Sequence, residues 1–122
     1  MIETALTIGL FTSIVFALFD FGYIMYMHQT LLSRLETAAR YGSLNPTDTT
    51  GMKNYVLYNQ TTGSGAGLFG LQAANVTASR SGSGTYNDRV NVSITGFGFR
   101  MFVMAESATA KPITVSLPVE PN

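Results

Sequence analysis

The chain has 122 residues, a formal net charge of zero at pH 7, and only 11% charged residues. This sparse and balanced charge gives no electrostatic basis for binding nucleic acid or an acidic surface. The absence of cysteine excludes disulfides, thiolate metal sites and cysteine nucleophiles from this chain. An apolar N-terminal segment and the helix that continues it leave only about eighty residues for a folded body, which is too few for a roomy active site.

The segment from Ile2 to Met27 is apolar, and its only charged residues are Glu3 and Asp20. It is longer than the roughly 20 residues that cross a bilayer and longer than the apolar region of a signal peptide, about 7–15 residues. Because inserted segments normally need flanking Lys or Arg for orientation, we expect that a basic leader has been removed. The alternative is an unusual start at Met1.

The two carboxylates need compensation from outside the helix, because a buried charge in an apolar environment is costly. Glu3 could pair with an α-amino group, either its own or a neighbour's. Asp20 precedes Arg34 by 14 residues, about 21 Å along a helix axis, so the two cannot meet within one helix. They could meet between parallel helices that are staggered along the axis. The alternative for Asp20 is a position in water at the membrane boundary.

Small residues recur every four positions in the same segment. On a helix they would form one ridge, over which a second helix can approach closely. We therefore predict a helix–helix contact, although small residues are also common in membrane helices. The ridge consists of Ala5, Gly9, Ser13 and Ala17.

The helical pattern continues beyond His28 as an amphipathic stripe. Gly42 is a candidate C-terminal cap, and Asn45-Pro46 cannot continue a helix. We predict one helix from about Ile2 to Tyr41, roughly 60 Å long. Residues 1–43 would form a transmembrane or filament-core helix, and residues 44–122 a small β-rich extracytoplasmic body. The stripe consists of Leu31, Leu32, Leu35, Ala38, Ala39 and Gly42.

The body begins with a short helix and an exposed loop. Asp48 can cap a helix that places Met52, Tyr55 and Val56 on one face. Residues 59–67 are rich in Gly, Ser and Thr, which is typical of an exposed loop.

Alternating residues then predict an antiparallel hairpin of 75–79 and 90–95, joined by the Gly/Ser run 81–84. Residues 113–117 lie between two prolines and are typical of an edge strand. Residues 97–102 could extend the second strand or turn back onto the helix. The resulting fold class is α+β, with the long N-terminal helix packed on a small antiparallel β-sheet through the stripe.

No pattern indicates catalysis. His28 is the only histidine and lies on an apolar helix, where a packing or membrane-boundary role is favoured over a catalytic one. Without a second His or any Cys, a transition-metal site has few ligands. The dense aromatic residues of the helix are better explained by helix–helix packing, with tyrosine marking a boundary, than by an electron path. We therefore expect no enzyme, no metal and no cofactor.

Four N-terminal segments form one pattern, namely Glu3-Thr-Ala5-Leu6, Asp20-Phe-Gly22, Gln29 and Leu35-Glu-Thr-Ala38-Ala39-Arg40-Tyr-Gly42. This pattern resembles the TadE-like pilins of type IV filament systems. The C-terminal half is similar to the same family more loosely, through Val56 to Asn59, Leu71, Asn75-Val76-Thr77 and Val90-Asn91-Val92.

The resemblance implies that a prepilin peptidase removes a basic leader, and that Glu3 compensates the N-terminal amine of an adjacent subunit. Two departures from the family are visible. The acid lies nearer the chain start than is usual, which raises the question whether Met1 is the mature start. Tyr23 stands where the family often has an arginine, so Asp20 would need a different partner.

By resemblance, the chain would be a structural subunit of an extracellular type IV-like pilus. It would reside in the inner membrane before the pilus machinery assembles it into a helical homopolymer without nucleic acid. The alternative is a single-span minor pilin or assembly scaffold that does not polymerise. A filamentous-phage-type coat protein is disfavoured because the chain lacks a basic C-terminal run. The expected subunit contacts are Glu3, Ala5, Gly9, Ser13, Ala17, Asp20 and Arg34.

Overall fold

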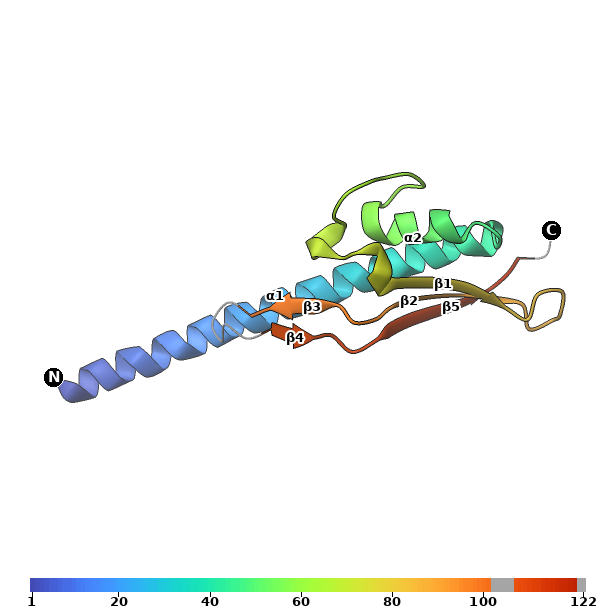
Figure 1. The fold of residues 1–122 in the computed structure, drawn as a ribbon. Coiled ribbons are helices and arrows are strands. Elements are labelled where there is room, and N and C mark those ends of the chain that lie inside the picture. The colour runs from blue at the N-terminus through green and yellow to red at the C-terminus, as the bar shows by residue number, and fades with distance from the viewer. Residues whose placement is uncertain (102–106, 121–122) are drawn as a thin grey trace.

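The computed structural model describes residues 1–101 and 107–120. Its dominant feature is helix α1 (Ile2–Leu44), whose N-terminal half projects from a body assembled around the C-terminal half (Figure 1). This arrangement confirms the α+β class with a long N-terminal helix and a small antiparallel sheet. After α1 come α2 (Thr49–Tyr58), two short 3-10 helices η1 (Leu68–Gly70) and η2 (Ala73–Asn75), and the strands β1 (Val76–Ser81), β2 (Arg89–Ile94), β3 (Gly98–Arg100), β4 (Ser107–Thr109) and β5 (Ile113–Pro118).

The end of α1 lies three residues beyond the predicted Tyr41, and the prediction of Gly42 as its cap is wrong. The C-cap residue is Asn45, whose backbone N–H donates to Tyr41 O at 2.9 Å. Gly42 lies inside the helix because the body packs closely against it. A Cβ atom at Gly42 would lie 2.7 Å from Met52 Sδ and 2.8 Å from Val90 Cγ1. This glycine is required for close packing rather than for a left-handed backbone.

The main sheet has the strand order β1-β2-β5, and both pairings are antiparallel. Val76 pairs with Ile94 across the predicted hairpin, and Ile94 pairs with Ile113 of the predicted edge strand. Alternation along β2 turns Val90, Val92 and Ile94 inward, so one face of the sheet is apolar and the other polar. The three predicted strands are therefore confirmed.

Residues 97–101 do not extend β2, which ends at Ile94. Phe97 is buried in the core, and β3 pairs with β4 in a separate two-stranded sheet. Phe99 lies opposite Ala108 in that sheet. Phe102, which was part of this prediction, lies outside the described residues.

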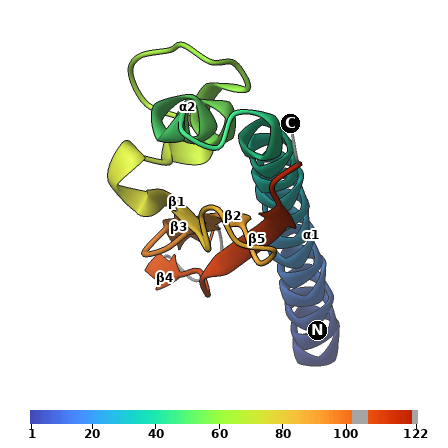
Figure 2. The same cartoon turned by 90° about the vertical axis from the view of Figure 1, so that its right-hand side faces the viewer.

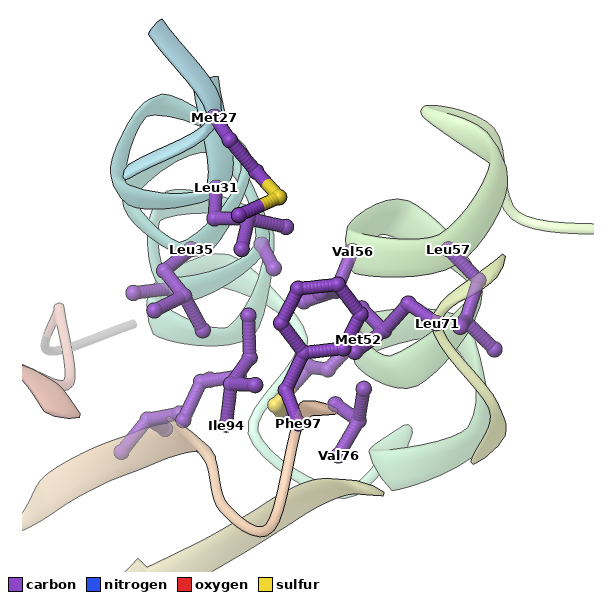
Figure 3. Close-up of a cluster of buried hydrophobic side chains, with 14 residues drawn as sticks. Met27, Leu31, Leu35, Met52, Val56, Leu57, Leu71, Val76, Ile94 and Phe97 are labelled. Atoms are coloured by element: carbon purple, nitrogen blue, oxygen red, sulfur yellow. The ribbon is translucent and has the colours of Figure 1, made fainter. Parts of the chain in front are cut away.

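The core lies between the sheet and a layer formed by α1 and α2. Most of the contacts of α1 with the sheet are with β2 and β5, and those of α2 are with β1. In Figure 2, viewed almost along α1, the two helices lie on the same side of the three-stranded sheet. The side chains of the predicted stripe meet those of α2 and the sheet in the close-up of Figure 3. The fully buried large side chains are Leu31, Leu35, Met52, Leu71, Val56, Val76, Val90 and Val92.

Helix α2 begins where the sequence predicted. Asp48 is its N-cap, and the carboxylate accepts a hydrogen bond from Gly51 N at 2.8 Å. Met52 and Val56 face the core, while Tyr55 is half-buried. Residues 59–66 are exposed, as expected for the predicted loop.

Candidate assembly interface

The N-terminal half of α1 leaves its large apolar side chains uncovered. None of the most apolar 18-residue stretch is buried, and the helix is long and apolar enough to cross a membrane. An apolar surface of this extent marks a contact with lipid or with protein. Ten large side chains are between 50% and 79% exposed, namely Ile2, Leu6, Ile8, Leu10, Phe11, Ile14, Phe16, Leu18, Phe19 and Phe21.

The predicted ridge of small residues lies on this uncovered half. A shallow apolar groove runs over Ala5 and Gly9, and Ile2, Leu6 and Leu10 complete its lining. A Cβ atom at Gly9 would meet no described atom within 4 Å. The groove is therefore open to a second helix. Ser13 and Ala17 continue the ridge and are also exposed.

Two hydroxyl groups on this half, those of Thr7 and Ser13, donate to carbonyl groups within the helix. Thr7 Oγ1 donates to Glu3 O at 2.8 Å, and Ser13 Oγ donates to Gly9 O at 2.9 Å. Such back-bonding removes the need for water at these side chains. This back-bonding lowers the cost of burying Thr7 and Ser13 against a neighbouring helix.

The two carboxylates of the apolar segment differ in their surroundings. Glu3 is exposed in the first turn of α1, and it forms no ion pair with any described residue. A negative charge in the first turn is favoured by the helix dipole. Asp20 is half-buried and already takes part in an interaction within its own chain. The strongest demand for an external partner therefore comes from Glu3.

Arg34 lies on the covered half of α1, well beyond Asp20 along the same helix. The residue is half-buried, and its Nη1 atom is buried without a hydrogen-bond partner in the part of the chain that the structure describes. A buried donor without a partner carries an uncompensated desolvation cost. The structure does not bring Arg34 and Asp20 together, so their pairing between subunits stays a prediction.

An aromatic cluster that the sequence reasoning missed marks the junction between the two halves of α1. The ring of Phe69 in η1 contacts Tyr23 edge-on at 6.4 Å and Tyr26 edge-on at 6.0 Å between centroids. Phe69 adopts φ 56° and ψ 23°, a left-handed conformation that costs about 1–2 kcal/mol for an L-residue. The only signal in the sequence was a bulky Leu68-Phe69 pair directly after a Gly-rich loop.

Two carboxylates anchor the body, and both have lowered pKa values. Tyr41 Oη donates to Asp48 Oδ2 at 2.7 Å, and this hydrogen bond lowers the pKa of Asp48 and raises that of Tyr41. Arg80 Nε donates to Asp88 Oδ1 at 2.8 Å, and Arg80 Nη2 pairs with Oδ2. The Arg80 hydrogen bonds are the main cause of the lowered pKa of Asp88. Both arrangements join neighbouring elements of the body.

The described residues contain no group of three or more His, Cys, Asp or Glu side chains that could hold a metal ion. His28 is exposed on α1, near the aromatic cluster in sequence.

Comparison with known proteins identifies the same region. Residues 1–40 match the family model described as TadE-like protein. The match includes the uncovered half of α1 and most of the buried stripe, and it confirms the resemblance inferred from the N-terminal segments. No curated protein and no solved structure matches the chain.

Proposed function

Because residues 1–40 match the TadE-like family, which is associated with Tad pili, we propose that this chain is a structural pilus subunit. It assembles into an extracellular type IV-like filament through its N-terminal helices and resides in the inner membrane before assembly. The helices form the filament core, and the β-rich bodies lie outside.

The observation that carries this proposal is the uncovered half of α1. Its apolar side chains are covered by lipid in the membrane stage and by neighbouring helices in the filament. Relative to exposure to water, each fully buried large apolar side chain contributes about 1.5–3 kcal/mol, so the ten side chains hold together the core of a filament that has left the membrane. Transfer from lipid to that core gains no such contribution and relies on close helix packing. The open groove over Ala5 and Gly9 gives a neighbouring helix a place to approach closely.

Glu3 is proposed to set the register of neighbouring subunits. It carries an exposed charge at the start of an apolar helix, and burial of that helix requires a compensating cation. The N-terminal amine of an adjacent subunit meets this requirement. A second proposed contact joins Asp20 of one subunit to Arg34 of a staggered neighbour. Asp20 makes this contact in addition to the interaction that it already has within its own chain.

A second candidate is a single-span minor pilin or scaffold that remains in the membrane and does not polymerise. It shares the exposed apolar half of α1, because one bilayer is enough to cover that surface. The two candidates differ in where the mature protein is found.

The deciding experiment combines electron microscopy with peptide mass spectrometry on material sheared from cells. A filament subunit is expected in sheared filaments, with its first peptide starting at or near Met1. Recovery of the protein only from membranes, with an intact leader, would contradict the polymerising function.

The role of Glu3 is tested with a matched pair of variants. Glu3→Ala is expected to reduce filament yield strongly while the chain still folds and inserts, because the body does not contact Glu3. Glu36→Ala also removes an exposed carboxylate, but from the C-terminal half of α1 that packs on the body. This variant is expected to leave filament yield unchanged. Equal yields from the two variants would rule out the register role.

A further inference from the structure

We propose that Tyr23, Tyr26 and Phe69 form an interfacial anchor that docks the body onto the surface of a phospholipid bilayer before assembly. We call these three residues the aromatic collar. This inference rests on the membrane stage of the proposed function. It adds that the body itself, through η1, binds the headgroup region of the bilayer.

The length of α1 places the collar at the bilayer surface. Tyr23 lies 21 residues after Ile2, which is about 32 Å along a helix. The hydrocarbon core of a bilayer is about 30 Å thick, and each headgroup region adds several ångströms. A helix that spans from its first turn therefore leaves the hydrocarbon near Tyr23. Tyr26, less than one turn further on, lies in the headgroup region.

The body contributes the third ring at the same level. Its η1 turn lies at the end of the α2 layer nearest the projecting half of α1 (Figure 1). The ring of Phe69 lies edge-on to both tyrosines, 6.4 Å and 6.0 Å away between centroids. The collar therefore joins α1 to a segment more than 40 residues later in the chain.

The turn that carries Phe69 is firmly held. Gly67 N donates to Leu71 O at 2.9 Å, and Leu71 N donates to Leu68 O at 3.0 Å. Leu71 is fully buried, so the core fixes one end of the turn. Gly70 has φ 76°, and Phe69 takes the left-handed conformation before it. A bulky residue rarely adopts this backbone unless the surrounding structure requires it, and such residues cluster at functional sites.

The three rings of the aromatic collar remain partly exposed to solvent although they pack against one another. Tyr23 is 48% and Tyr26 61% exposed, and Phe69 is half-buried. Tyrosine combines an apolar ring with a polar hydroxyl, which is why it is enriched at the boundary between lipid and water. We commit to the bilayer surface as the partner because the helix length, the residue types and the position of η1 agree on it.

The absence of tryptophan from the chain allows a direct test with single-tryptophan reporters. Phe69→Trp, Ile8→Trp and Tyr86→Trp are each reconstituted as the full chain in phosphatidylcholine–phosphatidylglycerol vesicles. Lipids brominated near the headgroup or near the chain end then quench tryptophan emission according to its depth. Ile8 lies in the predicted span, and Tyr86 is 97% exposed in the β1–β2 loop at the far end of the body.

We expect Phe69→Trp to lose about half of its emission to the shallow bromines and less to the deep ones, as an interfacial aromatic residue should. Ile8→Trp should be quenched most by the deep bromines, and Tyr86→Trp by neither. If Ile8→Trp is quenched but Phe69→Trp is not, the collar does not bind lipid although the membrane stage is correct. If Ile8→Trp is also unquenched, the membrane stage itself fails.

A second reporter guards against a folding defect at the strained position. Leu68→Trp places the indole beside Phe69 at a half-buried residue of the same turn, and circular dichroism checks that both variants fold. Shallow quenching of both reporters supports the anchor. Protection of Phe69→Trp only in assembled filaments would show that a second copy, rather than lipid, covers the collar, and would overturn the inference.

Discussion

The two halves of α1 share one continuous backbone and differ in what covers them. The C-terminal half buries a stripe beginning at Met27 under α2 and the sheet, with Leu35, Ala38 and Ala39 fully buried. The N-terminal half leaves ten large apolar side chains at least 50% exposed. In the N-terminal half apolar residues surround the helix, whereas in the C-terminal half they form one stripe. A helix that is apolar all round needs lipid or other helices as its surroundings.

The same residue type therefore has two different roles in the two halves of this helix. A leucine or a glycine on the covered half contributes to the stability of the body, and on the uncovered half to association. Paired substitutions at matched residue types can therefore separate folding from assembly.

The largest expected contrast is between Leu35→Ala and Leu10→Ala. Leu35 is fully buried, so its truncation should lower the free energy of unfolding of the body by about 2–5 kcal/mol. Leu10 is 66% exposed, and its truncation should change that free energy by less than about 0.5 kcal/mol. Urea unfolding of the full chain in mild detergent, followed by near-ultraviolet circular dichroism of tyrosine, measures both. Similar losses would show that the body also depends on the projecting half.

The two glycines of the helix offer the next contrast. Gly42→Leu should lower the free energy of unfolding by about 1–3 kcal/mol, since the new side chain meets Met52 and Val90. Gly9→Leu meets nothing in the monomer and should leave unfolding unchanged, yet reduce filament yield by filling the groove. The same urea measurement and the yield of sheared filaments test the pair. Normal yield from Gly9→Leu would argue against the ridge as a helix contact.

A smaller effect is expected from pH, and only in the body. The folded-state pKa values of Asp48 and Asp88 lie below the ordinary value of an aspartic acid, about 3.9, so each carboxylate contributes stability above that pH. This contribution is lost as the pH falls through the lowered folded-state pKa values. The urea midpoint should therefore decrease below about pH 4. The Asp48→Asn, Asp88→Asn double variant should have a lower midpoint at neutral pH and a flatter acid dependence; an unchanged acid dependence would contradict this assignment.

The smallest expected change in monomer stability is from Arg34→Met. Its buried Nη1 has no hydrogen-bond partner in the described residues, so removal of the guanidinium should alter the free energy of unfolding by no more than about 1 kcal/mol, in either direction. If Arg34 pairs with Asp20 of a neighbouring subunit, the same variant should lower filament yield. Arg40→Met, at an exposed position of the same helix, serves as the control. Equal yields from the two variants would exclude the pairing.

Much of the fold could be predicted because its signals are local. Alternation specified β1, β2 and β5, the carboxylate of Asp48 specified the start of α2, and helical periodicity specified the stripe that packs on the sheet. The role of Gly42 was misread because a glycine near a helix end commonly serves as a cap. Its actual reason, close packing against Met52 and Val90, involves residues distant in sequence.

The candidate assembly interface also combines features set by local sequence with features set by contacts between distant residues. The open ridge on the projecting half was predictable, since it depends only on spacing within one helix. The contact of Phe69 with Tyr23 and Tyr26 was not, because it depends on how a later segment returns to α1. No periodicity in residues 59–71 indicates that return.

The sequence by itself determined that the chain has a long apolar helix, that its later part carries an amphipathic stripe, and which strands form a sheet. These properties follow from hydrophobic periodicity and turn residues over short windows of chain. Only the tertiary structure decided where the body stops covering α1 and which side chains meet at that boundary. The physical reason is that burial depends on contacts between distant segments, and those contacts are set by close packing of the whole core.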